Sequence, residues 1–400
     1  MRHLMLHITA MLPVLVMLPM ASAAEVSTAE FIERIHELGG RVEIIGNPAT
    51  CPLFSVDLGW TDTTDEEARS ILGQRGIREL DLSNTRITAA SLKSVGQHDS
   101  LRSLNMYGTA LSDPDLSHIR SLLELRMLNI SDTKVGDLGM EVVGNFRELR
   151  VLRCMGTRIT DCGVRHLIRL KHLELLDLGL NRLTDEGAKH VSQLHAIRQL
   201  DLTGTRVGDP GVECLSRCKQ LVFLNLDATQ VSDSSLKKLL RATRLDILRI
   251  SDTRVVGTFC GDDRTLDLPL RELAVAGTKL RLSEMTKTPA LRHLRVLDAA
   301  DTPTSDNELA NIGVLANLER LNLLRAGVTD KGMHHLKQLK SLHELVLVDT
   351  AITDSGLCEL ADIPRLTELS IHGTRVSAAG VKRFAKLRPD VTVFWSPRRT

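Results

Sequence analysis

The chain has 400 residues, and its 51 lysines and arginines balance 50 aspartates and glutamates, giving a formal net charge of +1 at pH 7. This balance provides no long-range field that would recruit nucleic acid or an anionic membrane surface. Aromatic residues make up only 2% of the chain, which argues against stacking platforms for bases. We therefore expect no nucleic-acid partner.

The N-terminal residues have the pattern of an export signal. Arg2 gives a positive start, residues 4–20 are mostly apolar, and the small residues at 21–24 fit a signal-peptidase site. The modest length of the apolar run favours a cleaved signal over a retained membrane helix. The sequence predicts a signal peptide over residues 1–24, a mature chain that begins near Glu25, and no membrane insertion after cleavage. An uncleaved anchor is the alternative.

Residues 25–52 are predicted to form an N-terminal helix–strand cap. Ser27 and Glu30 have the spacing of a capping box in front of a helix over 28–38. Two glycines follow, and then a short strand over 41–44. Such a segment would cover one end of an array of stacked units.

A phrase of the form L-x-x-L-x-L-x-x-T recurs through most of the chain. Each closing position follows the previous one by 24 residues, except for one step of 25 residues between Thr253 and Thr278. The closing residues are Thr61, Thr85, Thr109, Thr133, Thr157, Asn181, Thr205, Thr229, Thr253, Thr278, Thr302, Ala326, Thr350 and Thr374. A period this regular indicates a solenoid. We assign residues 53–387 to about 14 repeats of 24 residues.

The repeat that closes at Thr157 illustrates one unit. Leu152 and Cys154 alternate with outward-facing residues, as in a strand with one buried face. Helical spacing follows, with Thr160 as the N-cap and the negative charge of Asp161 in the first turn. Each unit is thus strand, turn, short helix and turn. We expect the closing threonine to bond to backbone groups in its turn.

The phrases 160–164 and 176–181 resemble leucine-rich repeats of the cysteine-containing, ribonuclease-inhibitor-like kind. That resemblance implies an α/β horseshoe with a parallel sheet on the concave face and short helices on the convex face. The helix, Gly-Gly and strand at 25–61 resemble the start of exported leucine-rich-repeat proteins of planctomycete-type bacteria. This second likeness implies a bacterial protein of the periplasm, the cell envelope or the exterior.

Two parts of the chain depart from the repeat. Residues 388–400 are predicted to be a capping strand and tail, in which Trp395 covers the last leucine layer. The pattern also weakens over 255–270, where glycines and adjacent acids replace helical spacing. We interpret this segment as irregular chain in place of a helix. The alternative is a loop or flex point that serves a partner.

Nothing in the sequence points to catalysis, a metal or a cofactor. No serine elbow, zinc-protease motif or phosphate loop is present, and the histidines are scattered. Cys214 and Cys218 have a spacing that could hold a metal or form a bridge, but no second ligand pair lies nearby at zinc-finger spacing. We predict unpaired structural thiols, with Cys154 buried in its strand, and no enzymatic activity.

The outward strand positions are more informative about function. Directly before the buried leucines of the middle repeats stand five apolar residues, interrupted only by Gln199: Met127, Val151, Leu175, Phe223 and Ile247. Neighbouring outward positions add Arg153, Met155, Asp177 and Arg249. At a strand spacing of about 4.8 Å, the apolar residues would extend along roughly 25 Å of the concave face. The alternative is that neighbouring strands cover them, since β-propensity also favours such residues.

Two functional hypotheses follow. The first is a non-catalytic exported scaffold that binds a protein or cell-envelope partner through these nine residues, which fits the protein-contact function that the leucine-rich-repeat resemblance implies. The second is a substrate-recognition adaptor, which would resemble the repeat domain of F-box proteins in ubiquitin ligases. It requires an F-box and a cytosolic location. The helix at 28–38 is too short for an F-box, so we favour the first hypothesis.

Overall fold

The computed structural model describes residues 27–45, 52–260, 268–287 and 291–397. The predicted signal peptide lies outside these residues, as do Cys51 and the part of the irregular segment at 261–267. No helix within the described ranges is both long enough and apolar enough to cross a membrane.

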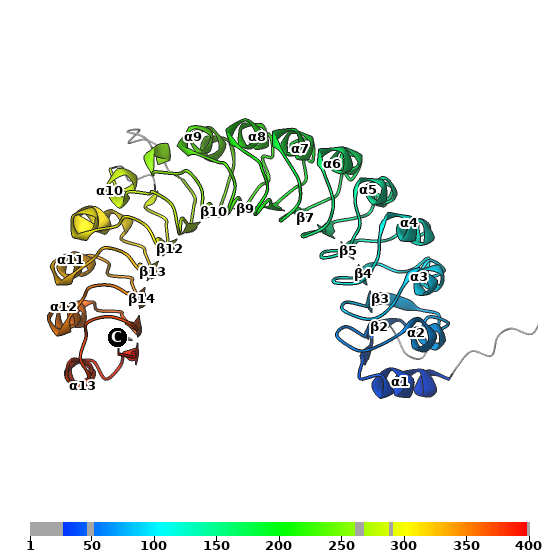
Figure 1. Ribbon diagram of the computed structural model, residues 1–400, viewed down its shortest axis with the longest axis horizontal. Coiled ribbons are helices and arrows are strands. Elements are labelled where there is room, and N and C mark those ends of the chain that lie inside the picture. Colours follow the sequence, from blue (N-terminus) through cyan, green and yellow to red (C-terminus); the bar gives the residue numbers. More distant parts are fainter. Residues whose placement is uncertain (1–26, 46–51, 261–267, 288–290, 398–400) are drawn as a thin grey trace, which may run out of the picture.

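The chain forms a horseshoe in which strands line the inner side and helices follow the outer side (Figure 1). A single sheet of 16 strands has the strands in sequence order. Strand β1 pairs antiparallel with β2, and every later pair is parallel. The predicted leucine-rich-repeat solenoid is confirmed.

The strands are short and evenly spaced along the chain. They are β1 (Arg41–Ile44), β2 (Phe54–Asp57), β3 (Ile77–Asp81), β4 (Ser103–Asn105), β5 (Met127–Asn129), β6 (Val151–Arg153), β7 (Leu175–Asp177), β8 (Gln199–Asp201), β9 (Phe223–Asn225), β10 (Ile247–Arg249), β11 (Glu272–Ala274), β12 (Val296–Asp298), β13 (Arg320–Asn322), β14 (Glu344–Val346), β15 (Glu368–Ser370) and β16 (Thr392–Phe394). Adjacent parallel strands pair residue for residue, so that Leu152 lies beside Leu176 and Leu176 beside Leu200.

The helices of the outer side are also short. They are α1 (Thr28–Glu37), α2 (Asp65–Ile71), α3 (Ala89–Val95), α4 (Asp113–Leu116), α5 (Asp137–Val143), α6 (Asp161–Leu167), α7 (Asp185–Val191), α8 (Asp209–Leu215), α9 (Asp233–Ala242), α10 (Leu282–Met285), α11 (Asp330–Leu336), α12 (Asp354–Glu359) and α13 (Ala378–Leu387). The 3-10 helices are η1 (Ser117–Ile119), η2 (Thr258–Cys260), η4 (Asp306–Leu315) and η5 (Leu360–Asp362).

Two of these elements depart from the predicted short α-helix. In one repeat η4 takes its place, and in another the three residues of η2 do so. The described parts of the irregular segment, residues 255–260 and 268–270, contain no α-helix, and the 3-10 helix η2 stands where irregular chain was predicted.

The recurring threonine holds the turn after each strand, as predicted. Thr157 donates its hydroxyl hydrogen to the carbonyl of Cys154 at 2.9 Å, and the other closing threonines bond to the carbonyl three residues earlier. Asn181 makes a wider contact. Its amide donates to Cys154 O in the preceding repeat at 2.7 Å, and its Oδ1 accepts from Thr157 Oγ1 at 2.8 Å. Asn181 thereby joins two repeats.

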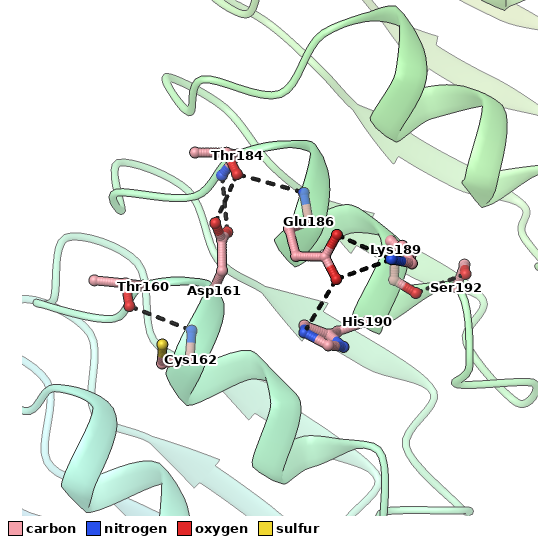
Figure 2. A network of polar contacts seen from close by, with 8 residues as sticks. All are labelled: Thr160, Asp161, Cys162, Thr184, Glu186, Lys189, His190 and Ser192. Carbon is pink, nitrogen blue, oxygen red and sulfur yellow. Dashed lines mark hydrogen bonds and ion pairs between the residues drawn. The ribbon is translucent and has the colours of Figure 1, made fainter.

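A second polar row runs along the helix starts, and sequence reasoning missed its main contact. Thr160 caps α6 as predicted, accepting from Cys162 N at 3.3 Å. Asp161 does more than contribute charge to its own helix, because its carboxylate accepts from Thr184 N at 2.9 Å and Thr184 Oγ1 at 2.6 Å in the next repeat (Figure 2). Equivalent bonds to the following repeat are made by Asp65, Asp113, Asp137, Asp185, Asp209, Asp233, Asp306, Asp330 and Asp354. We call these ten residues the aspartate row.

The aspartate row explains the glycine in the third position of most repeat helices. A Cβ built on Gly187 would lie 2.4 Å from Asp161 Oδ1, and one on Gly163 would lie 2.5 Å from Asp137 Oδ1. Where serine replaces the glycine, the side chain joins the contact: Ser235 Oγ donates to the Asp209 carboxylate at 2.7 Å. In the repeat that contains η2, Phe259 stands at the equivalent position, and its backbone N–H donates to Asp233 Oδ1 at 3.0 Å.

The two ends of the array are covered by different elements. Phe31 and Ile35 of α1 are buried against the first repeat, within the segment where a cap was predicted. At the other end β16 extends the sheet, and Trp395 packs on the core and donates to Val376 O at 3.2 Å.

Arg388 binds backbone carbonyl groups at the C-terminal end of the array. The sequence analysis did not single out this residue. Its guanidinium donates to the carbonyls of Ala361, Ile363 and Leu366 at 2.7–3.0 Å, and its side chain is only 14% exposed. Arg388 thereby contributes hydrogen bonds to three carbonyls at the end of the array, of which Ile363 O also accepts from Leu366 N at 3.4 Å.

The aspartate row predicts that Gly187→Ala destabilises the protein, although the same change stabilises an ordinary exposed helix. In an open helix this change stabilises by up to about 1 kcal/mol. Here the new methyl group would overlap the Asp161 carboxylate, so we expect a loss of about 1–3 kcal/mol in the free energy of unfolding, measured by urea denaturation. In the Asp161→Ala background the overlap is gone and the same change should be neutral or stabilising. An equal loss in both backgrounds would contradict this explanation.

Candidate binding surface on the concave face

The structure brings the five apolar residues into one row. Each is the first residue of its strand, and each pairs in register with its neighbours along the sheet. All five are partly exposed, and Gln199 between them is exposed: Met127, Val151, Leu175, Phe223 and Ile247. We call these five residues the apolar row.

A polar row runs beside the apolar row, at the last position of the same strands. Arg153 and Arg249 are exposed, Asp177 and Asp201 are partly exposed, and Arg249 Nε lies 3.7 Å from the Asp227 carboxylate. Met155 lies in the turn beyond this row and is partly exposed. The residues predicted for the site therefore line one continuous part of the inner arc.

The two central carboxylates are held by their own turns. Asp177 Oδ1 accepts from Gly179 N at 3.1 Å, and Asp201 Oδ1 accepts from Thr203 N at 2.8 Å. Burial raises the pKa of Asp177 above its usual range, and the charge of Asp201 adds to this rise, although Gly179 N–H and Arg153 oppose it. Asp177 is thus a carboxylate whose negative charge is only partly compensated by its surroundings.

A small hollow joins the two rows at the centre of the arc. It has a volume of about 120 Å³ and is lined by the side chains of Leu175, Gln199 and Phe223 on one side and Arg153, Asp177 and Asp201 on the other. We call it the central slot. A hollow of this size suits one long side chain better than a folded ligand.

The lining of the whole arc is acidic, which the sequence analysis did not recognise. Counted over the first and last core-flanking positions of β2–β16, nine carboxylates face three arginines: Asp57, Glu79, Asp81, Asp177, Asp201, Glu272, Asp298, Glu344 and Glu368 against Arg153, Arg249 and Arg320. The complete chain carries a net charge of only +1. The excess of carboxylates is present in the sequence, but it becomes visible only when the charges at these outward positions are added up over all repeats.

Positive charge collects directly before the first outward position of the repeats, at the edge of the sheet. Six arginines stand one residue before their strand, and Arg78 takes the same place within β3: Arg78, Arg102, Arg126, Arg150, Arg198, Arg271 and Arg295. A hollow of about 390 Å³ lies at this edge between Arg271, His293, Arg295 and Asn317. Its arginines are already engaged, because Arg271 lies 3.6 Å from the Asp246 carboxylate and Arg295 lies 3.2 Å from that of Glu319. We therefore place the candidate site on the concave face.

The cysteines of the described residues carry no sign of chemistry. Cys154, Cys162, Cys214, Cys218 and Cys358 are all free thiols. Cys154 is buried, as predicted, and burial raises its pKa well above the ordinary value, while burial raises the pKa of Cys218 to about 12. Within the described ranges, no group of three or more histidine, cysteine or acidic side chains is arranged to hold a metal ion.

Two adjacent leucines test the placement of the apolar row. Leu175 is partly exposed, whereas Leu176 is fully buried in the leucine layer. We expect Leu176→Ala to lower the free energy of unfolding by about 2–5 kcal/mol. Leu175→Ala should cost about 1 kcal/mol or less, since less apolar area leaves water there. Urea denaturation of both variants measures the difference, and equal losses would show that Leu175 is part of the core.

Comparison with known proteins agrees with the fold. A family model described as leucine-rich repeat matches residues 169–192 and 194–216, and no curated protein matches the sequence. The chain is similar to an internalin of Listeria monocytogenes (TM-score 0.59, 18% identity, covering 78% of this chain and 90% of the internalin). It is also similar to a leucine-rich-repeat protein of Leptospira interrogans (TM-score 0.50, 19% identity, 81% and 91% covered).

A third similar structure comes from a plant. It is the leucine-rich-repeat ectodomain of the Arabidopsis receptor kinase HAESA, solved in complex with an N-terminally extended IDA peptide hormone ligand (TM-score 0.51, 16% identity, covering 89% of this chain and 72% of the ectodomain). At these identities the likeness concerns the fold alone. The chain described here contains leucine-rich repeats and has the open horseshoe fold that is typical of protein-binding domains.

Proposed function

We propose that the protein is a non-catalytic, exported recognition scaffold that binds a protein or cell-envelope partner through its concave face. The observation that carries this proposal is the apolar row, five partly exposed side chains on β5, β6, β7, β9 and β10 with charged residues among their neighbours. An exposed apolar surface with a polar rim is typical of a protein-binding site.

The sheet makes this row a suitable site because its geometry is fixed before binding. Parallel strands hold the row in register, with each strand hydrogen-bonded to the next. Strands about 4.8 Å apart place the row along roughly 25 Å. A partner therefore meets side chains on a rigid base, which lowers the entropy cost of association.

The similar structures are consistent with this use of the fold. The HAESA ectodomain is described in complex with a peptide hormone ligand. An extended peptide or a protruding segment of a folded protein fits the shape of the inner arc. We propose the same kind of contact here, with a different partner, since the likeness extends only to the fold.

The proposed location rests on the N-terminal sequence. Residues 1–24 have the order of charge, apolar run and small residues of a cleaved export signal. We propose export to the periplasm, the envelope or the exterior of a bacterial cell of planctomycete type. The adaptor alternative requires an F-box, and α1, with ten residues, is too short to provide one.

The apolar row predicts the result of a capture experiment. Leu175→Ser/Phe223→Ser should lose a partner that the wild-type protein captures from an envelope extract of the source cell. The matched control is Leu123→Ser/Leu138→Ser, which changes two leucines that are 58% and 71% exposed and lie outside the row, and it should retain the partner. Unchanged far-UV circular dichroism verifies folding. Equal capture by both variants would contradict binding through the row.

The location is tested separately. The protein expressed with its own N-terminus should be recovered outside the cytosol, and N-terminal sequencing should show a chain that starts near Glu25. A full-length chain in the cytosol would contradict export and would revive the adaptor alternative.

A further inference from the structure

The central slot combines an apolar wall with an acidic wall. Leu175 and Phe223 stand on either side of Gln199 in the apolar row, and Asp177 and Asp201 form the neighbouring wall. A side chain that entered here would lie along apolar groups and end beside two carboxylates.

The two carboxylates differ in the partners that they already have. Asp201 accepts hydrogen bonds on both oxygens, from Thr203 N at 2.8 Å and from Asn225 Nδ2 at 3.0 Å. Asp177 accepts from Gly179 N on Oδ1 at 3.1 Å. Its Oδ2 is the acceptor best placed for a donor from outside the chain. A donor with a positive charge would also offset the repulsion between the two carboxylates.

Resting on the proposed function, we infer that the central slot takes a lysine or arginine side chain from an extended segment of the partner. The aliphatic stem of that side chain lies against Leu175 and Phe223, and its cationic end meets Asp177 and Asp201. Lysine and arginine are the residues that combine an apolar stem with a charged end. The nine carboxylates of the concave lining extend the same preference to the rest of the segment, so the partner surface is basic.

The arginines near the slot do not oppose this assignment. The arginine positions at the sheet edge come one residue before the apolar row, while Asp177 and Asp201 stand at the opposite end of their strands. Arg153 belongs to the slot and lowers the pKa of Asp177, but burial and the charge of Asp201 leave that pKa raised. The wall formed by Asp177 and Asp201 therefore still carries negative charge that Arg153 does not balance.

The chain itself supplies a mild substitution for the test. Asn105, Asn129, Asn225 and Asn322 occupy the same strand position as Asp177 in other repeats. In each case Oδ1 accepts the same backbone bond from two residues ahead, at 3.0–3.1 Å. Asp177→Asn and Asp201→Asn thus keep the bond within each turn and remove the charge, while Asp201→Asn also gives up the bond from Asn225 Nδ2. Asp298→Asn makes the identical change in a strand outside the slot, and Asp298 Oδ1 likewise accepts from Ala300 N.

The experiment is a selection of phage-displayed random linear peptides on the full-length protein. Wild-type protein and the Asp298→Asn control should enrich peptides in which a lysine or arginine stands among apolar residues. The Asp177→Asn/Asp201→Asn variant should lose that enrichment. For a synthetic peptide from the selection, replacing the lysine by norleucine should weaken binding to the wild type about tenfold or more, measured by fluorescence anisotropy.

Each other outcome decides against the inference. Peptides without a conserved cation that bind wild type but fail to bind Leu175→Ser/Phe223→Ser would overturn the inference and leave the proposed function standing. Cationic peptides enriched equally by the Asp177→Asn/Asp201→Asn variant would overturn it as well, by placing the cation elsewhere. Failure of the wild-type protein to enrich any peptide would count against both the slot and the apolar row as a binding site.

Discussion

Each repeat of this protein is too thin to bury its own leucines, so every leucine layer is covered by the layers beside it. This single constraint explains the residue-for-residue register of the strands, in which leucine stands beside leucine across the sheet. It also explains why polar contacts between repeats are so regular. The closing threonines fix the turn after each strand, and the aspartate row bonds each helix start to the next repeat. A change at one of these positions would disturb two repeats rather than one.

The same constraint leaves the outward positions of the strands outside the leucine core. At the first outward position the fold accepts a leucine, a glutamine or an arginine. At the last outward position an aspartate or asparagine can also bind the following turn, as Asp177 does through Gly179 N. What these positions carry is therefore informative about binding. In the middle of the arc they carry the apolar row, and along the whole lining they carry an excess of carboxylates in a chain that is almost neutral overall. The net charge of the chain is close to zero, but the concave lining is acidic and the edge of the sheet is basic.

Sequence periodicity was sufficient to predict the solenoid, the position of the strands and the outward direction of the apolar row, because strand and helix periods report local burial. The horseshoe was implied by the resemblance to leucine-rich repeats. Periodicity was not sufficient for contacts that join residues of different repeats. Asp161 looks like an ordinary first-turn aspartate, and only the stacked structure shows that its carboxylate binds Thr184. Arg388 follows the last helix like many surface arginines, yet it binds three carbonyls at the C-terminal end. The acidic lining could have been predicted, since the outward positions were known, but local inspection of single repeats did not reveal their sum.

Stacking of interchangeable units is tested most directly by deletion. Removing residues 158–181 takes out one whole period of 24 residues and joins Thr157 to the equivalent point of the next repeat. That shortened chain should keep the far-UV circular dichroism per residue of the parent protein and a cooperative urea transition. Removing residues 162–181 breaks the register and should abolish both. Equal behaviour of the two shortened chains would contradict a fold held together by repeats that cover one another.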